Sequence, residues 1–330
     1  MELVRGMELV RGLDNITRDP NASLTIGSFD GLHLGHQRIL QQMRKLEYPI
    51  TVLTFDPHPQ SVVRSDKKAP PLLTSFEERL ELYERFGVTY LIVLTFDEQF
   101  AKLSPEEFIE DIVVKKIGLG NIFIGPRHRF GSNRKGNVEL LRKMGRSLDF
   151  KTNIVNPVNR FGEIISSSRI RRLIQEGDAL TAWRCLGRPY YLDGTVVKGD
   201  GRGKRLGFPS ANLEITDPNK IEAPHGIYAT VTEVNGVRLP SVSHFGPRPT
   251  FIGAKPSIET HILGFNKDIY GMRIRVGLID LVREIKTFTS AESLVEQLHV
   301  DARTALQRLA ELGFGKRARL RIQRYGKVLH

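Results

Sequence analysis

The stretch Gly27-Ser28-Phe29-Asp30-Gly31-Leu32-His33-Leu34-Gly35-His36 holds two histidines three residues apart. It follows the apolar, β-prone residues 24–26 and precedes the helix-like residues 37–46. The pattern therefore predicts a strand, a loop and the start of a helix. A helix start offers free N–H groups and a positive dipole end to an anion. Two imidazoles can donate to the same phosphate, and the small Gly35 lets a flat base approach the backbone.

The first half of the chain alternates strand-like and helix-like segments. We expect strands at residues 51–55, 90–96 and 121–125, and helices at residues 77–86 and from Ser104-Pro105-Glu106-Glu107 onward. Continuous apolar strands alternating with helices are typical of a parallel sheet buried on both faces. Ligands of such sheets bind at the carboxyl ends of the strands. The histidine loop, Pro57-His58-Pro59 and the loop after Gly125 all come at such ends.

A serine-rich segment closes the first half. Ile165-Ser166-Ser167-Ser168-Arg169-Ile170-Arg171 precedes an amphipathic helix that ends at about Gly177. Serine hydroxyls at a helix start cap the helix. The same hydroxyls and N–H groups can hold a triphosphate, with Arg169 or Arg171 adding charge. Because a histidine loop stands in the same α/β domain, we favour phosphate binding.

The second half changes character from about Tyr190. We expect short strands at residues 194–198, 226–234, 258–263 and 272–281, and a closing helix at residues 290–312. Several short strands followed by one helix predict a small β-barrel. The boundary between the halves is expected near Gly187-Arg188-Pro189.

The segment Lys198-Gly199-Asp200-Gly201-Arg202-Gly203-Lys204-Arg205-Leu206-Gly207-Phe208-Pro209-Ser210-Ala211-Asn212 is the densest motif of this half. Four glycines and four basic residues can wrap a polyphosphate with backbone N–H groups. A solvated flexible loop is the alternative. The hydroxyl of Ser210 and the amide of Asn212 favour the first reading, because oxygens two residues apart suit Mg²⁺.

These motifs resemble known families. The histidine loop is similar to that of the HxGH nucleotidyltransferase superfamily, which transfers nucleotides without a covalent enzyme intermediate. Gly207-Phe208-Pro209-Ser210-Ala211-Asn212 resembles the hexapeptide of the riboflavin kinase family, with serine where threonine is usual. Arg248-Pro249-Thr250-Phe251, Glu259-Thr260-His261-Ile262 and Tyr270-Gly271 also match that family. Together the halves look like the bifunctional bacterial riboflavin kinase/FMN adenylyltransferase family, over roughly residues 24–309.

The resemblance implies roles for the matching residues. Glu259 would take the proton from the ribityl 5′-hydroxyl of riboflavin as that oxygen attacks the γ-phosphorus of ATP, and Ser210 and Asn212 would bind Mg²⁺. His33 and His36 would hold the ATP phosphates while the FMN phosphate attacks the α-phosphorus and pyrophosphate leaves. The other expected contacts to ATP or phosphate are Gly27, Phe29, Asp30, Gly35, Ser167, Ser168 and Arg171 in the first half, and Gly199, Gly203, Lys204 and Gly207 in the second. The flavin-binding candidates are His58, Arg127 and Arg248.

Two segments depart from the family pattern. After the strand at Asn121 the family usually has Gly-x-Asp/Asn-Phe-x-Phe-Gly, whereas this chain has Gly125-Pro126-Arg127-His128-Arg129-Phe130-Gly131. A neutral hydrogen-bonding position has become a cation, and this change could retune or weaken nucleotide and flavin binding. The second departure is His244-Phe245 before Gly246, where smaller or amide residues are common.

Composition limits the class of protein. A length of 330 residues favours two domains, and 40% hydrophobic and 26% charged residues are ordinary for a soluble globular protein. No apolar run could span a membrane and no signal peptide is visible. The single Cys185 fits a reducing cytoplasm. The net charge of +12 implies acidic partners, which nucleotides would satisfy.

We therefore expect an α/β Rossmann-like HxGH nucleotidyltransferase domain at residues 13–187 and a small β-barrel riboflavin kinase domain with a C-terminal helix at residues 188–312. Residues 313–330 would be a basic tail. The hexapeptide MELVRG occurs twice in residues 1–12, which we expect to lie outside the fold. The expected substrates are riboflavin, FMN and ATP, with no membrane partner, no nucleic acid, and weak self-association left open.

Two other function classes remain open. The histidine loop also occurs in aminoacyl-tRNA synthetases, so the first alternative is a nucleotidyltransferase that acts on another substrate or is associated with RNA, with a riboflavin kinase module. The tail after Gly315 holds six basic residues and no acid, which is typical either of nucleic-acid binding or of a solvated disordered end, and we favour the solvated end. The chain has no Lys-Met-Ser-Lys-Ser loop. A flavin-binding module without catalysis is the second alternative, and it would need neither Glu259 nor the histidine loop.

Overall fold

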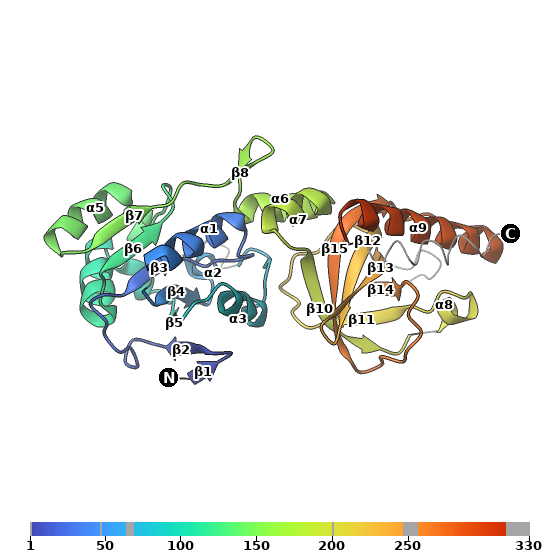
Figure 1. Ribbon diagram of the computed structural model, residues 1–330, viewed down its shortest axis with the longest axis horizontal. Helices are drawn as coiled ribbons and strands as arrows, with labels where there is room; N and C mark the ends of the chain where they lie inside the picture. The colour runs from blue at the N-terminus through green and yellow to red at the C-terminus, as the bar shows by residue number, and fades with distance from the viewer. Residues whose placement is uncertain (1, 47, 64–68, 200, 247–256, 315–330) are drawn as a thin grey trace. The chain divides into compact units, whose positions relative to one another are not determined.

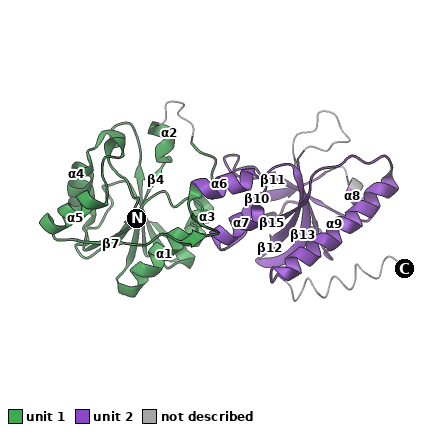
Figure 2. Ribbon diagram, turned by 90° about the horizontal axis from the view of Figure 1, so that it is seen from above, with its two compact units in different colours: residues 1–167 green, residues 168–330 purple. Residues whose placement is uncertain are grey.

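The chain forms two compact units, residues 1–167 and residues 168–330 (Figure 2). The structure is a computed structural model that describes residues 2–46, 48–63, 69–199, 201–246 and 257–314. The division comes earlier than the expected boundary at residues 187 and 188. The reason is α7 (Ala179–Leu186), which packs against barrel strands of the second unit.

The first unit is built on a seven-stranded sheet, in the order β1-β2-β5-β4-β3-β6-β7 (Figure 1). Every neighbouring pair is parallel except β1 and β2, which are antiparallel. The expected parallel sheet is thus confirmed. The strands are β1 (Glu2–Val4), β2 (Met7–Arg11), β3 (Ser23–Ile26), β4 (Ile50–Asp56), β5 (Tyr90–Thr95), β6 (Asn121–Ile124) and β7 (Lys151–Ile154).

Helices cover both faces of this sheet. Alternate residues of β5 show the division: Leu91 packs with α1 (Leu34–Met43) and α3 (Phe76–Arg85), whereas Ile92 packs with the helix at Phe108–Ile117 and α5 (Val138–Ser147). Side chains of successive strand residues point to opposite faces, so continuous apolar strands fit a sheet covered twice. The helix that follows the Ser104 cap begins as α4 (Pro105–Glu107) and continues at Phe108–Ile117 as a π-helix. The remaining short elements are 3₁₀ turns at Arg44–Leu46, Phe100–Lys102 and Ser132–Arg134, α2 (Pro59–Val63), β8 (Asn159–Arg160) and β9 (Glu163–Ile164).

The expectation that residues 1–12 lie outside the fold is wrong. The second copy of the hexapeptide forms β2, which pairs with β5 and buries Met7 to 1% exposure. The first copy forms β1 and pairs with β2, and Arg5 bonds Glu81 at 3.0 Å. Arg5 and Gly6 both have positive φ, 52° and 76°, the geometry of a two-residue hairpin turn. The copies fold because the apolar positions of the hexapeptide suit a strand and its Arg-Gly end suits the turn.

The second unit is a closed six-stranded barrel with a long helix, as expected (Figure 1). The strands run in the order β10-β11-β14-β13-β12-β15, and α9 (Ala291–Glu311) packs on β12, β13 and β15. Two strands, β11 and β13, were not expected; β13 contains Pro240, which cannot donate to a ladder. The strands are β10 (Tyr190–Val197), β11 (Ala211–Ile215), β12 (Gly226–Val234), β13 (Val237–Gly246), β14 (Ser257–Ile262) and β15 (Arg273–Arg283); the other helices are α6 (Ser167–Gln175) and α8 (Arg202–Arg205).

The two faces of the barrel strands differ. Buried hydroxyls on one face bond to one another, with Thr230 at 2.8 Å from Ser241 and Ser243 at 2.8 Å from Thr260. The alternate residues, such as Ile227 and Val242, face the other way and form an apolar core with α9. This second face carries the site described next for the second unit.

Candidate functional site

The histidine loop joins β3 to α1, as the sequence predicted. His33 is the N-cap of α1, and its Nδ1 accepts a hydrogen bond from the N–H of His36 at 3.3 Å. The proton of a neutral His33 ring therefore lies on Nε2. The two rings stack, with 3.7 Å between their centroids. The expected pairing of these imidazoles at a helix start is thus present in the structure.

The surroundings of His36 favour a neutral ring. Burial lowers the pKa of His36 well below its ordinary value, and the nearby His33 lowers that pKa further. The Nδ1 of His36 is enclosed and has no hydrogen-bond partner among the described residues. Phe29 packs its ring against His36, 4.9 Å between centroids. A neutral imidazole donates through one nitrogen, so His36 can offer a hydrogen bond to a phosphate oxygen without carrying charge of its own.

Gly35 is required by the packing of His33. A Cβ added at Gly35 would lie 3.0 Å from Cε1 and 3.1 Å from Nδ1 of the His33 ring. If the histidine loop carries the adenylyl transfer that its resemblance implies, Gly35→Ala should lower that reaction about tenfold, because it moves the His33 ring away from its stacked position. The phosphorylation that the resemblance implies for the other unit should stay unchanged in the same variant. Initial rates of both reactions measure this effect, and equal rates in variant and parent would contradict it.

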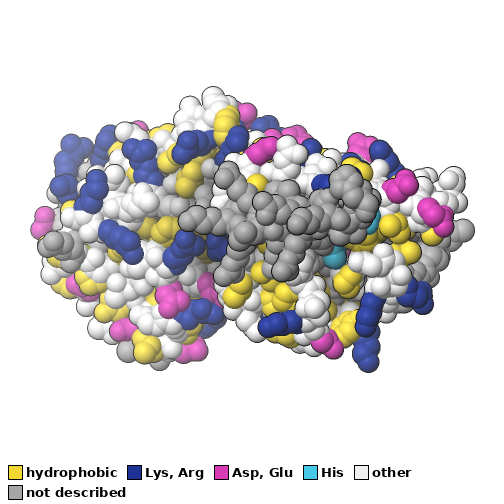
Figure 3. Space-filling model, turned by 45° about the vertical axis from the view of Figure 1, so that its right-hand side comes forward, with side chains coloured by type: hydrophobic (Ala, Val, Ile, Leu, Met, Phe, Trp, Pro, Cys, Tyr) yellow, Lys and Arg dark blue, Asp and Glu magenta, His cyan; other side chains and the backbone are white. Residues whose placement is uncertain are grey.

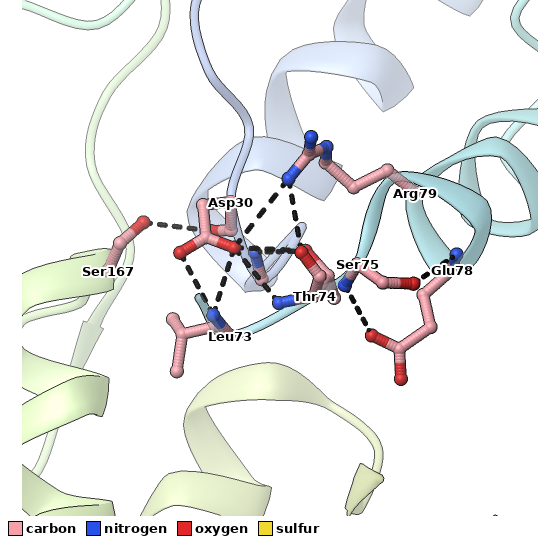
Figure 4. Close-up of polar contacts among 8 residues, drawn as sticks. Asp30, Leu73, Thr74, Ser75, Glu78, Arg79 and Ser167 are labelled. Carbon is pink, nitrogen blue, oxygen red and sulfur yellow. Dashed lines mark hydrogen bonds and ion pairs between the residues drawn. The ribbon is translucent and has the colours of Figure 1, made fainter. Parts of the chain in front are cut away.

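Asp30 occupies the centre of a polar network (Figure 4). Its carboxylate is fully buried and accepts hydrogen bonds from the N–H groups of Leu73 and Thr74, at 3.1 and 2.9 Å, and from Oγ1 of Thr74 at 3.0 Å. Arg79 of α3 lies 4.0 Å away. The hydroxyl of Ser167 donates to the carbonyl of Asp30 at 2.8 Å. The carboxylate therefore holds the histidine loop against the segment that starts α3, and the expected contact of Asp30 with ATP stays a prediction.

The other expected phosphate contacts are divided between the units. Gly27 follows β3 directly, and Ser167 is the last residue of the first unit. Ser168 and Arg171 lie in α6 and belong to the second unit. That these residues bind the same ATP as His33 and His36 stays a prediction.

The loop after β6 is strongly basic. Arg127, Arg129, Arg134 and Lys135 are all exposed. Figure 3 shows many Lys and Arg side chains on the left-hand part of the molecular surface. His128 stacks on Phe130, and burial lowers its pKa to about 4. His58 lies two residues after the end of β4 and accepts a hydrogen bond from the N–H of Gln60 at 3.2 Å. The third flavin candidate, Arg248, lies outside the described residues, as does the rest of its motif.

The second unit contains a pocket of about 590 Å³ between the barrel and α9. The predicted metal ligands Ser210 and Asn212 and the predicted base Glu259 line it. Strand register explains how they meet, because Asn212 of β11 lies directly opposite Glu259 of β14. Ser210 donates to the Glu259 carboxylate at 3.4 Å. The pocket thus brings together a hydroxyl, an amide and a carboxylate from segments far apart in the sequence.

The glycine-rich segment forms one wall of this pocket. Gly199, Gly203 and Lys204 line it, whereas Gly207 lies outside the lining. A Cβ on Gly199 would collide with the side chain of Asn212, and one on Gly203 would collide with the carbonyl of Phe208. These glycines therefore allow the close approach of the loop to the polar residues, and Lys204 is the exposed cation beside them.

Sequence reasoning missed several residues that shape the pocket. His261 bonds the carbonyl of Pro209 through Nδ1 at 2.7 Å, which fixes the turn before Ser210. Burial lowers the pKa of His261, and its hydrogen bond to Pro209 acts in the opposite direction. Arg283 of β15 forms a two-pronged ion pair with Asp301 of α9, at 2.8 and 2.7 Å, and so ties the helix over the barrel. His261 follows Glu259 by two residues, so the sequence could have placed it on the same face of the strand as Glu259. No sequence motif connects Arg283 to Asp301.

No helix in the described part of the chain is long and apolar enough to cross a membrane. Within the same residues, no three His, Cys, Asp or Glu side chains come together as a metal-binding group.

Comparisons with known proteins agree with the two-unit architecture. A family described as FAD synthetase matches residues 15–169, and a family described as riboflavin kinase matches residues 186–309. The bifunctional riboflavin kinase/FMN adenylyltransferase of Escherichia coli (strain K12) is 35% identical over 308 residues, which are 91% of this chain and 97% of that protein. The protein of the same name from Bacillus subtilis (strain 168) is 33% identical and covers 88% of this chain and 93% of its own length.

A solved structure from Streptococcus pneumoniae, described as a macrolide-efflux protein, is similar over nearly the whole chain. It superimposes with a TM-score of 0.81 at 31% identity and covers 91% of this chain and 98% of its own. The likeness therefore includes both units.

Proposed function

Because this chain belongs to the family of bifunctional riboflavin kinase/FMN adenylyltransferases, we propose that its two units divide two successive reactions. The second unit phosphorylates riboflavin with ATP to give FMN. The first unit transfers AMP from a second ATP to FMN, which gives FAD and pyrophosphate. The observation that carries the kinase assignment is the meeting of Ser210, Asn212 and Glu259 in one pocket.

In the kinase reaction, Glu259 accepts the proton of the ribityl 5′-hydroxyl as its oxygen attacks the γ-phosphorus. Lys204 and the glycine-rich wall hold the phosphates of ATP. The apolar side of the same pocket includes Ile227, Val242 and Phe288, and it suits the flat ring system of a flavin. Positioning the hydroxyl in line with the phosphate supplies most of the rate.

The oxygens of Ser210 and Asn212 fit a magnesium ion. Both line the pocket beside Glu259, and hydroxyl, amide and carboxylate oxygens are the hard ligands that Mg²⁺ accepts together with water and phosphate oxygens. When bound there, Mg²⁺ would neutralise charge on the phosphates of ATP. Ser210 and Asn212 would orient the nucleotide by fixing where those phosphates lie.

A magnesium titration of the kinase reaction tests this site. We expect Ser210→Ala to lower kcat/KM about tenfold and to raise the magnesium requirement, because water replaces a fixed ligand. Ser210→Thr keeps the oxygen and is the matched control, expected within about threefold of the parent. Asn212→Ala should behave like Ser210→Ala. If Ser210→Ala titrates like the parent, Ser210 is a turn residue and the metal lies elsewhere.

In the adenylyl transfer, His33 and His36 donate hydrogen bonds to the phosphate oxygens of ATP. The FMN phosphate attacks the α-phosphorus, and the bond to pyrophosphate breaks. The bond from His36 places the proton of a neutral His33 ring on Nε2, and in the reaction this N–H would donate to the charge that develops there. Ser168 and Arg171 are proposed to hold the β- and γ-phosphates.

The remaining expectations stay proposals. We propose a cytoplasmic location, no nucleic-acid partner and at most weak self-association. The basic tail, which suggested RNA, lies outside the described residues except for Gly313 and Phe314.

Product chromatography tests the proposed function. In one arm the protein receives riboflavin, ATP and Mg²⁺, and FMN should form first and FAD after it. In the second arm it receives FMN and ATP, and FAD and pyrophosphate should form in equal amounts. Absence of both FMN and FAD in the first arm would contradict the kinase assignment. FMN without FAD in the first arm, together with no FAD in the second arm, would contradict the adenylyltransferase assignment, and the departure at Arg127 and His128 would be the first place to look for the cause.

A further inference from the structure

His244 lies directly across the β13–β14 pair from Glu259. Asn212 lies across the β11–β14 pair on the other side of the same residue. Side chains directly opposed on antiparallel strands share a face, with Cβ atoms about 4.5–5.5 Å apart. All three residues line the pocket. Glu259 is therefore flanked by an amide on one side and by an imidazole on the other.

We propose that His244 is a positioning residue of the kinase reaction, which orients the Glu259 carboxylate and receives the proton that Glu259 removes from riboflavin. The proposal rests on the proposed function, since it needs Glu259 to be the base. The O–H bond of the ribityl hydroxyl breaks as its oxygen bonds the γ-phosphorus, and ADP leaves with the electron pair of the broken P–O bond. The proton passes from Glu259 to a ring nitrogen of His244 and then to water.

The surroundings of His244 leave it well suited to this task. On its other side, β12 places the uncharged Ile227 opposite His244. Arg283, which follows next around the barrel, is held in its ion pair with Asp301. His261 bonds Pro209, and burial lowers its pKa. The other ionisable residues that line the pocket are Lys204, Tyr270 and Lys286.

A histidine at this position does more than an amide could. An amide can orient a carboxylate by donating an N–H, but it cannot accept a proton near neutral pH. A free imidazole titrates near pH 6.5. When protonated, His244 would pair with Glu259 and make the carboxylate a weaker base. Protonation of His244 should therefore slow the kinase reaction at acidic pH.

The test compares His244→Asn with the parent protein. Asparagine keeps a hydrogen-bond donor and removes the titration. We expect the kcat of riboflavin phosphorylation to fall about tenfold, a part of the factor that a general base supplies. The KM for riboflavin should change less than kcat. Over about pH 5.5–8.5, we expect an acidic limb in the profile of the parent and none in the profile of the variant.

Two further variants make the experiment decisive. His225→Asn is the control, because His225 is exposed, precedes β12 and does not line the pocket, so the profile should not change. Imidazole added to His244→Ala should restore part of the lost rate. Should His244→Ala fail to fold, His244→Asn and His244→Gln give the answer through their pH profiles.

The outcomes separate this inference from the proposed function. A parent-like pH profile in His244→Asn, with Glu259→Gln inactive, overturns the role of His244 alone. A lower rate with an unchanged profile and no rescue by imidazole also overturns it, because only a structural role would remain. Full activity of Glu259→Gln overturns the proposed base, and with it the need for a second residue.

Discussion

Glu259→Gln is expected to lower riboflavin phosphorylation about 10²-fold or more, because the amide keeps the shape of the side chain and removes the base. The loss should fall mainly on kcat, since Ser210, Asn212 and the apolar wall still bind the substrates. FAD synthesis from supplied FMN should persist, because the histidine loop lies in the other unit. Single-turnover assays with labelled ATP measure both steps in one preparation.

Riboflavin phosphorylation by Glu259→Gln is best compared with that of Asn212→Asp. This second variant changes the residue that lies opposite Glu259 on the adjacent strand and leaves the proposed base in place. If Glu259→Gln phosphorylates riboflavin at the parent rate, Glu259 is a structural carboxylate and the base assignment is wrong.

His36→Ala is expected to give the opposite pattern. FAD formation from FMN should fall at least about 10²-fold, the scale of removing one donor to the transition state. FMN formation from riboflavin should remain near the parent rate. The His36 ring also packs against His33 and Phe29, so thermal unfolding should accompany the assay. His36→Asn, which keeps a hydrogen-bond donor, is the matched control and should retain more activity than His36→Ala.

Equal losses of both activities in His36→Ala would contradict the division of labour between the units. Unchanged FAD formation would instead remove His36 from the adenylyl transfer.

The sequence predicted the elements that carry strong periodicity. Residues 226–234 form β12 as expected, and the closing helix expected at residues 290–312 is α9, Ala291–Glu311. Apolar alternation and helix caps are local signals, so one segment suffices to predict them. The histidine loop was predictable for the same reason, since strand, loop and helix start follow one another in the chain.

Features that depend on distant contacts were beyond the sequence. Asp30 was expected to touch phosphate, yet the segment around Thr74 surrounds its carboxylate. The bond between His261 and Pro209 and the ion pair between Arg283 and Asp301 arise only once the barrel closes. The division after Ser167 likewise follows from the packing of α7, which no local pattern encodes.

The paired hexapeptides show how a sheet can gain a strand when a short segment of its sequence is duplicated. In the first copy of the hexapeptide, the strand is followed by Arg5 and Gly6, the two residues that close a hairpin between Val4 and Met7. A tandem copy of the hexapeptide therefore carries both a new strand and the turn through which this strand pairs with the original copy. It adds a strand at the open edge and leaves the pairing of β2 with β5 untouched. A duplication of this kind leaves the rest of the sheet unchanged, because the turn within the repeat pairs the added strand with the edge strand.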